Sequence, residues 1–122
     1  MKIYRPVQPE SDIQNHVRVA LSKHGCVFRT NAGRAYQGKM VYSQEFKQMV
    51  LTDIHPVSLL APGFSDLLFV GQNRTAFIEI KKPGEKPRPD QVNFLDRMTS
   101  LGHIAGVARS TEDALRLIWV DV

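Results

Sequence analysis

Two carboxylates and a lysine stand out in an otherwise apolar stretch of the sequence, GFSDLLFVGQNRTAFIEIKK (residues 63–82). Asp66 begins the first apolar run, Glu79 lies inside the second run, and Lys81 follows two residues later. Charged groups are costly to bury unless they are paired or bind an ion. The polar residues between the two runs predict a β-hairpin. The two carboxylates and the lysine would then occupy strand positions, and their presence there needs a chemical explanation.

The length of the hairpin turn decides whether these three side chains meet. If residues 71–74 form a four-residue loop, Asp66 lies opposite Glu79 on the neighbouring strand. Directly opposed residues share a face, and Lys81, two residues after Glu79, points to the same side. A slip of one residue in the pairing would move them to opposite faces.

Two opposed carboxylates repel each other, and one of them takes up a proton unless a cation lies between them. Oxygen ligands of this kind suit Mg²⁺ or Mn²⁺, which activates water and neutralises charge on a phosphate. Lys81 is placed to hold the attacking water or to stabilise a pentavalent phosphate. The pattern therefore indicates a hydrolytic centre for phosphodiesters. The competing interpretation is a solvated strand face that carries a weak ion pair.

The composition is that of a small folded protein with one core. The chain has 122 residues, 43% of them hydrophobic, which predicts a single domain over residues 1–122. No run of 18 apolar residues is present, the first residues lack the apolar segment of a signal peptide, and Cys26 is the single cysteine. We therefore expect a cytoplasmic protein that is not secreted, acting at the nucleoid or in the cytoplasm of a host cell.

The net charge of +4 is compatible with a nucleic-acid partner without requiring one. Four of the cations lie in KKPGEKPR (residues 81–88), directly after the second strand. The four histidines are not spaced as a zinc set, and no cysteine cluster accompanies them.

Hydrophobic periodicity predicts the elements around the hairpin. We expect a helix between residues 9 and 24, with Ser11 and Gln14 as a possible capping box, and a strand over 26–31. A helix over 89–102, a strand over 103–110 and a final helix from about residue 110 follow the hairpin. This order predicts an α/β fold.

Residues 32–62 are harder to interpret. We expect loop and turn with at most a brief strand over 32–42, and one or two helical turns over 43–54. Pro56, Pro62 and Gly63 are expected to break any regular element.

The ordered set of motifs resembles the PD-(D/E)XK nuclease superfamily, and within it the VRR-NUC branch, the virus-type replication and repair nuclease domain. The resemblance rests on PGFSDLL (62–68), EIKKPG (79–84) and PDQVNFLDRMTSLG (89–102), preceded by Glu10 with Gln14 four residues on and by RTNAG (29–33). It covers about residues 10–110. Ser65 stands where the family often has proline, and residues 34–62 match no part of the pattern.

The resemblance implies a central mixed β-sheet flanked by helices in the order αβββαβ. It also implies a Mg²⁺- or Mn²⁺-dependent site in which Lys81 is the catalytic lysine and Gln91 reaches the same site. The implied metal ligands are the carboxylates of Asp66, Glu79 and Glu10 and the backbone carbonyl of Ile80. Glu10 at a helix start is alternatively a dipole-compensating residue, and Gln91 a first-turn surface residue. The candidate DNA contacts are Arg29, Asn31, Arg34, Lys82, Lys86 and Arg88.

By the same resemblance the chain is expected to be a DNA-binding endonuclease, a hydrolase acting in DNA repair. A structure-specific enzyme can rely on phosphate contacts and on the deformability of branched DNA. Four-way (Holliday) junctions or flaps are therefore the expected substrates, and a two-fold homodimer the expected assembly. The alternatives are a non-catalytic nucleic-acid-binding scaffold subunit, or a nuclease for RNA or for a specific restriction sequence.

Overall fold

The computed structural model describes residues 8–30, 35–57 and 60–119 of the chain. In chain order the elements are α1 (Glu10–Leu21), β1 (Gly25–Arg29), β2 (Ala35–Ser43), β3 (Gln48–Val57), β4 (Leu67–Gly71), β5 (Arg74–Ile80), α2 (Pro89–Ser100), β6 (Ile104–Ala108) and α3 (Thr111–Trp119). No helix among the described residues is long and apolar enough to cross a membrane.

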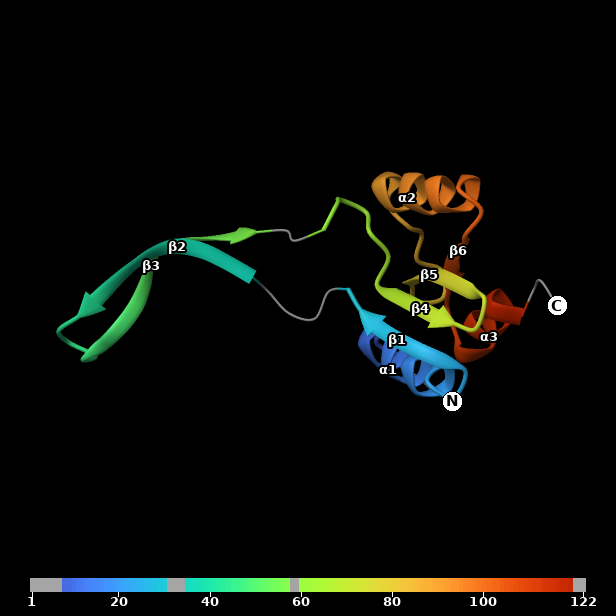
Figure 1. Ribbon diagram of the computed structural model, residues 1–122, viewed down its shortest axis with the longest axis horizontal. Coiled ribbons are helices and arrows are strands. Elements are labelled where there is room, and N and C mark those ends of the chain that lie inside the picture. The colour runs from blue at the N-terminus through green and yellow to red at the C-terminus, as the bar shows by residue number, and fades with distance from the viewer. Residues whose placement is uncertain (1–7, 31–34, 58–59, 120–122) are drawn as a thin grey trace, which may run out of the picture.

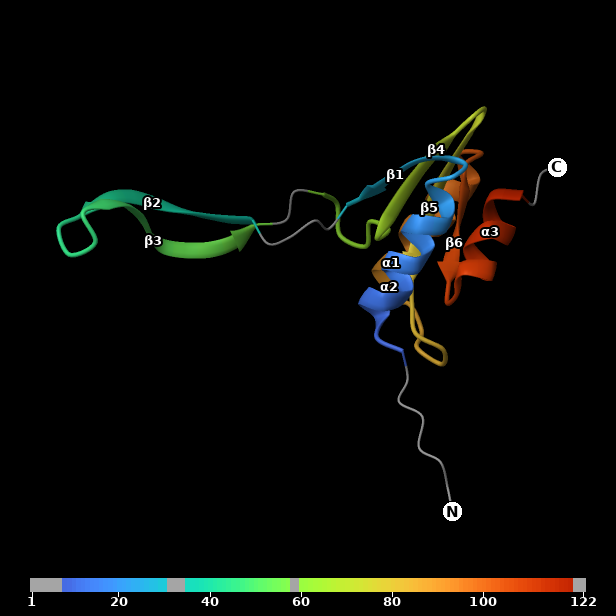
Figure 2. The same cartoon turned by 90° about the horizontal axis from the view of Figure 1, so that it is seen from below.

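Four strands form one mixed sheet in the order β1-β4-β5-β6. The β1–β4 and β4–β5 pairs are antiparallel, and β5–β6 is parallel because α2 carries the chain back across the sheet. Helices α1 and α3 cover one face of this sheet and α2 covers the other (Figures 1 and 2). The predicted αβββαβ core with a mixed sheet flanked by helices is confirmed. The final helix expected from about residue 110 is α3, and the β2–β3 hairpin is an addition that the sequence did not predict.

The central strand β5 presents different chemistry to its two faces. Ala76, Ile78 and Ile80 are fully buried in the apolar core against α1 and α3. The alternate residues Phe77 and Glu79 face α2. Phe77 packs edge-on against Phe64 and Phe94, and these rings seal the α2 side of the sheet. Glu79 thus lies buried on the same face of the sheet as this aromatic cluster.

The β4–β5 register agrees with the sequence prediction, but the predicted turn is wrong. Val70 pairs with Thr75 and Leu68 with Phe77, as the alternation requires. Gly71 also pairs with Arg74, which shortens the expected four-residue loop to a two-residue turn. Asn73 takes a left-handed backbone conformation (φ 58°), which asparagine tolerates better than most residues. Both turn lengths give the same pairing between the strands, so each residue of β4 and β5 points to the predicted face of the sheet.

Helix α1 begins at Glu10, where the sequence predicts a helix start, but without the expected capping box. Pro9 is the N-cap residue, no side chain caps this end, and the backbone N–H groups of Asp12 and Ile13 bond to the Pro9 carbonyl. The Ser11–Gln14 capping box is therefore absent. Proline supplies a φ of −59° at the entry to the helix, which is compatible with starting a helix.

The expectations for residues 35–57 are wrong, whereas Pro62 and Gly63 lie outside any helix or strand, as expected. Residues 35–43 and 48–57 are the strands of a long antiparallel hairpin, and the expected helical turns over 43–54 do not form. Pro56 lies inside β3, opposite Tyr36 near the open end of the hairpin. Gln, Glu, Lys and Met around the turn favour helices by propensity, but cross-strand pairing prevails. The turn itself lacks the Asn-Gly or Asp-Gly signal that makes a hairpin recognisable.

Gly63 holds the approach to β4 close to the start of α2. It has a left-handed backbone (φ 80°), and an added Cβ would collide with the backbone carbonyl of Asp90. Gly84 has a similar φ of 83°, but an added Cβ there would meet no atom within 4 Å. A side chain at Gly63 would therefore meet both a steric clash and an unfavourable backbone conformation, whereas one at Gly84 would meet the unfavourable conformation alone.

We predict that Gly63→Ala lowers the free energy of unfolding by at least about 2 kcal/mol more than Gly84→Ala. The control carries only the left-handed penalty of about 1 kcal/mol. Urea unfolding of both variants measures the difference, and equal losses in the two would show that the contact with Asp90 is not a constraint.

Candidate active site

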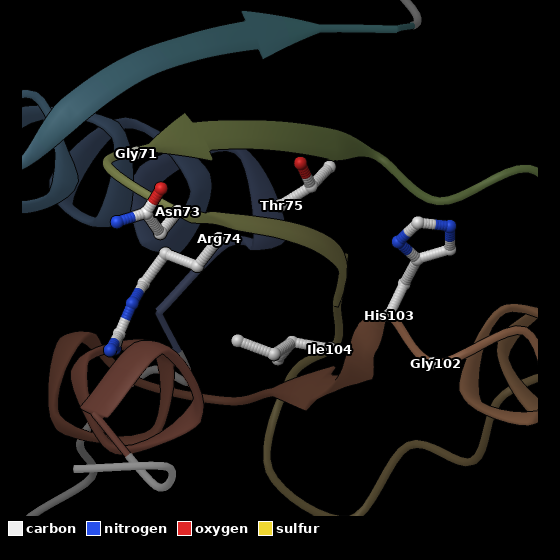
Figure 3. A pocket seen from close by; sticks show the side chains of 7 residues that line it. All are labelled: Gly71, Asn73, Arg74, Thr75, Gly102, His103 and Ile104. Carbon is white, nitrogen blue, oxygen red and sulfur yellow. The ribbon is translucent and has the colours of Figure 1, made fainter.

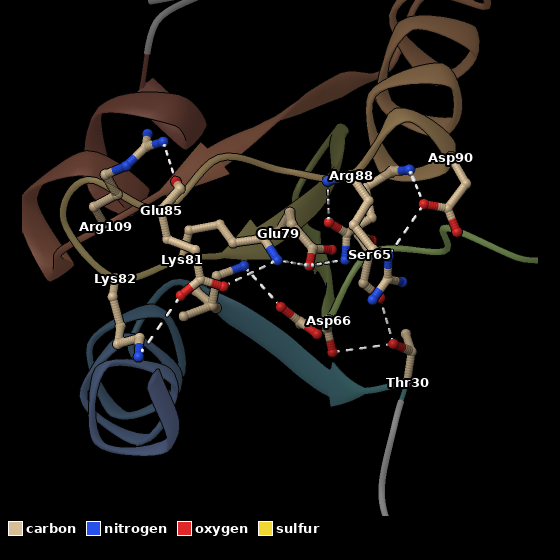
Figure 4. Close-up of polar contacts among 12 residues, drawn as sticks. Thr30, Ser65, Asp66, Glu79, Lys81, Lys82, Glu85, Arg88, Asp90 and Arg109 are labelled. Atoms are coloured by element: carbon tan, nitrogen blue, oxygen red, sulfur yellow. Dashed lines mark hydrogen bonds and ion pairs between the residues drawn. The ribbon is translucent and has the colours of Figure 1, made fainter. Parts of the chain in front are cut away.

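The structure brings Asp66, Glu79 and Lys81 to the same end of the β4–β5 hairpin (Figure 4). Asp66 precedes β4 and does not begin it, contrary to expectation. Its Oδ2 accepts a hydrogen bond from the backbone N–H of Ile80 at 2.8 Å. Its carbonyl accepts from the N–H and the hydroxyl of Thr30, at 3.0 and 3.1 Å. Asp66 is therefore fixed between the ends of two strands.

Ser65, at the position where the family often has proline, is fully buried. Its hydroxyl donates to the carbonyl of Leu67 at 3.1 Å, and its own carbonyl accepts from the Thr30 hydroxyl. Side-chain and backbone bonds of this kind restrain the residue before Asp66, which is the restraint that a proline ring would otherwise supply.

Gln91 orients Glu79 from the first turn of α2. Its amide Nε2 donates to Glu79 Oε1 at 2.8 Å, and its Oε1 accepts from the backbone N–H of Arg88 at 2.9 Å. The amide thus caps its own helix and holds the carboxylate with the same group. Only 6% of Gln91 is exposed, which excludes the interpretation as a surface residue.

Lys81 is buried and lies between two carboxylates. Its Nζ is 3.9 Å from Glu79 Oε1 and 3.5 Å from Glu85 Oε1. Glu85 was not predicted as a site residue from the sequence; its signal was a lone carboxylate four residues after Lys81 in an otherwise basic loop. Arg109 Nη2 donates to the Glu85 carbonyl at 2.8 Å and so ties this loop to the end of β6. The strand end is therefore a packed charge network and not a solvated face.

Glu79 is the most deeply buried carboxyl group in the site. It is 1% exposed, and its Oε2 has no hydrogen-bond partner within the described part of the chain. Burial, together with the charge of Asp66, raises the pKa of Glu79 to about 8, although Lys81 opposes the shift. A buried carboxyl beside a second carboxylate keeps its proton unless a cation lies next to it.

Glu10, the first residue of α1, completes the acidic surroundings. Burial raises its pKa above the usual value; Lys81 opposes this shift, and Asp66 and Glu85 add to it. The same interactions show that Glu10 lies within electrostatic reach of the network. Glu10 also stands in the first turn of α1, so the dipole-compensating role applies to it at the same time.

The donor set of this cluster fits a hard divalent ion, although no group of three or more Asp, Glu, His and Cys side chains in the described ranges is arranged as a metal site. Asp66 and Glu79 supply two carboxylates, and Glu79 Oε2 is buried without a partner. In an extended strand the N–H and C=O of one residue point to the same neighbour. Because the Ile80 N–H bonds to Asp66, the Ile80 carbonyl is directed to that side as well. Two carboxylates, a carbonyl and waters suit Mg²⁺ or Mn²⁺.

The candidate DNA-binding residues are only partly brought to this site. Lys82, Lys86 and Arg88 lie in the loop between β5 and α2; Lys82 Nζ is 3.8 Å from Glu85 and Arg88 Nε is 3.3 Å from Asp90. Arg29 is exposed at the end of β1, next to the Thr30 that holds Asp66. Asn31 and Arg34 lie outside the described residues.

An open cavity of about 380 Å³ lies at the other end of β5 (Figure 3). None of the candidate site residues lines it. Its walls are Gly71, Asn73, Arg74, Thr75, Gly102, His103 and Ile104. The charge network and this cavity are thus separated by the length of the strand.

The fold has a counterpart among solved structures. One described as "VRR_NUC domain" superimposes with a TM-score of 0.57 at 20% sequence identity, covering 89% of this chain and 92% of that chain. No protein-family model and no curated protein matches the sequence. The chain therefore has the fold of a VRR-NUC domain, as the motif resemblance predicted.

The raised pKa of Glu79 gives a prediction for stability against pH in the absence of divalent ions. Below the unfolded pKa of 4.5 both states are protonated, and this group has no effect. Between 4.5 and about 8 the unfolded state releases a proton that the folded state keeps, so stability falls as pH rises. We expect Glu79→Gln, which keeps the acceptor for Gln91, to be more stable than wild type by a few kcal/mol at about pH 8 and equal to it at about pH 4.

Urea unfolding in EDTA across this range measures the effect. Glu112→Gln, which neutralises an exposed carboxylate at the start of α3, is the matched control and should follow wild type. Parallel curves for wild type and Glu79→Gln would contradict a buried, unpaired carboxyl.

Proposed function

We propose that the chain is a metal-dependent endonuclease that hydrolyses phosphodiester bonds in DNA, and that residues 1–122 act as one VRR-NUC-like domain. The observation that carries the proposal is the buried Glu79 carboxyl, held by Gln91 on one oxygen and without a partner on the other, beside Asp66 and Lys81. The likeness of the fold to a VRR-NUC domain supports the same reaction class.

Each residue has a separate task in this proposal. Asp66, Glu79 and the Ile80 carbonyl would hold Mg²⁺ or Mn²⁺, with Glu10 acting directly or through a water. When bound, the ion supplies Lewis-acid stabilisation of phosphate charge and an activated water. Gln91 keeps the Glu79 carboxylate oriented, and Lys81 stabilises negative charge at the phosphate. Glu85 holds the Lys81 ammonium in place until a phosphate competes for it.

A non-catalytic scaffold is the weaker alternative. Gathering Glu10, Asp66, Glu79 and Glu85 around a single buried lysine costs folding free energy, since desolvation and repulsion oppose it. A binding module gains nothing from that cost. A cation that enters the cluster during catalysis removes it.

For the substrate we propose branched DNA, such as four-way junctions or flaps, cut by a homodimer in DNA repair in the cytoplasm. Sequence readout requires an element that reaches base edges with polar or charged groups. The β2–β3 hairpin, the one described insertion, carries only two cations and two anions, so its charge does not favour entry into a groove. The cations of the β5–α2 loop instead suit phosphate contacts.

Cleavage assays test the active site and the substrate together. We expect cuts in labelled four-way junctions or flaps, and far fewer in linear duplex, with Mg²⁺ or Mn²⁺. Lys81→Ala and Asp66→Asn should each reduce the rate by about 100-fold or more. Lys23→Ala, an exposed lysine beyond the opposite end of α1, should cut like wild type. Cuts confined to RNA or to one duplex sequence would reject the branched-DNA substrate, and binding of all DNAs without cuts would favour the scaffold.

Ion binding gives a readout that is independent of activity. Mn²⁺ at about 100 times its dissociation constant should stabilise wild type by about 2.7 kcal/mol, a shift of several degrees in Tm. Asp66→Asn should lose most of this shift. Asp96→Asn, which removes an exposed carboxylate on α2, should retain it. An equal response in all three proteins would show that the ion binds elsewhere.

A further inference from the structure

The β2–β3 hairpin stands apart from the rest of the fold. It projects away from the sheet and its three helices (Figures 1 and 2). Its strands pair with each other over almost their whole length and, among the described residues, pack extensively against no other element. Its conformation therefore receives little support from the domain core.

One face of this hairpin is almost entirely apolar. Met40 pairs with Leu51 and Tyr42 with Met49, and paired residues share a face. Alternation along β2 places Tyr36 on the same face. On β3, the extra residue of a bulge near Asp53 (φ 53°) brings Ile54 to this face as well. An added Cβ on Gly38 would lie 3.1 Å from Leu51 Cγ, so Leu51 covers this face where β2 has no side chain. The opposite face, called the polar face below, carries Ala35, Gln37, Lys39, Val41, Ser43, Gln48, Val50, Thr52, His55 and Val57.

The large side chains on the apolar face are exposed. Met40 is 59% exposed, and Phe46, in the turn at the tip, is 64% exposed. The exposed set is Tyr36, Met40, Tyr42, Phe46, Met49, Leu51 and Ile54. At about 200 Å² per fully exposed large side chain, these residues present on the order of 700 Å². A monomer rarely exposes so large an apolar patch, and an isolated two-stranded hairpin is marginal in water, so this face requires a cover.

We propose that a second copy of the chain is this cover, and that the two hairpins pack apolar face to apolar face about a two-fold axis. The proposal rests on the homodimer proposed above and names its interface. The available area matches the roughly 800 Å² per partner of a standard interface. The hairpin has two cations, Lys39 and Lys47, and two anions, Glu45 and Asp53, in a chain of net charge +4. This neutral segment does not repel its own copy, and it lacks the positive charge that a phosphate backbone requires.

The two β2–β3 hairpins would form a small two-layer β-sandwich that joins the two protomers. Two sheets packed in this way lie about 10 Å apart, and an isologous contact uses the same patch twice. The interface lies on β2 and β3, whereas the charge network lies at the ends of β4 and β5, so dimer formation leaves both sites uncovered. The assembly would present two active sites related by a two-fold axis, which suits a branched DNA with two scissile strands.

The oligomeric state tests the interface. Wild type at tens of micromolar should sediment at twice the chain mass of 13.8 kDa. Met40→Lys combined with Leu51→Lys should sediment as a monomer, because two cations on each face would be buried in the dimer. Lys39→Gln combined with Thr52→Lys, on the opposite face of the same strands, should remain a dimer. A monomeric wild type, or a dimer that persists in the Met40/Leu51 variant, overturns the proposal.

Cross-linking tests the face-to-face arrangement in a Cys26→Ser background. Single cysteines at Met40, Met49 or Leu51 should give a covalent dimer on mild oxidation from at least one position. Cysteines at Lys39, Gln48 and Thr52, their neighbours on the polar face, should give none. Bonds from the polar face alone, or from neither face of a dimer, would reject this arrangement.

The result is separable from the fate of the proposed nuclease. A monomer that still cuts branched DNA in a metal-dependent manner removes the dimer inference and leaves the active site intact. A hairpin-dependent dimer that cuts no nucleic acid keeps the interface and removes the nuclease. A monomeric wild type whose DNA affinity falls in the Met40/Leu51 variant would make the hairpin a base-stacking surface and would overturn the proposal.

Discussion

The burial of the Glu79 carboxyl is the constraint on which the arrangement of the site depends. A carboxyl group on the inner face of a central strand has one oxygen satisfied by Gln91 and one without a partner. Its surroundings must therefore accommodate a charge, a proton or an ion. The start of α2, the residue before β4 and the loop after β5 all supply groups that bear on this one side chain. Their positions are set by the need to manage a single carboxyl in an apolar interior.

The two faces of β5 have different roles, and the apolar face offsets the free-energy cost of burying the Glu79 carboxyl on the other. The α1–α3 side is closed by aliphatic side chains, which supply the hydrophobic stabilisation of the domain. The α2 side carries the aromatic cluster and, beyond it, the charge network. The strand thus stabilises the domain with one set of residues and positions the polar groups with the other. Because the two sets alternate along one backbone, the geometry of the site is as rigid as the sheet.

The sequence permitted prediction of the elements whose pattern is local and repeated. The facing of Asp66, Glu79 and Lys81 followed from alternation alone, and an error in the turn length did not alter it because both turns preserve the pairing. Gln91 required the tertiary structure, since a glutamine in the first turn of a helix has no local signal that distinguishes a surface residue from a buried donor. Glu85 was missed because its partner is reached by the turning of a loop. The β2–β3 hairpin was missed because the residues around its turn favour helices and because the turn lacks the Asn-Gly or Asp-Gly pair that is typical of hairpins.

The point where the hairpin leaves the sheet has a consequence for how such a protein can change during evolution. The chain departs after Arg29 and returns at Leu67, and these two residues are paired across β1 and β4. The β2–β3 hairpin is thus inserted between two points of the chain that already lie side by side, so changing its length alters loop-closure entropy by only about 0.6 kcal/mol per doubling. Thr30 bonds to the Asp66 carbonyl at this junction and holds the carboxylate's backbone independently of whatever lies beyond. The hairpin is therefore a module that can be lengthened, shortened or exchanged while the geometry of the charge network stays the same.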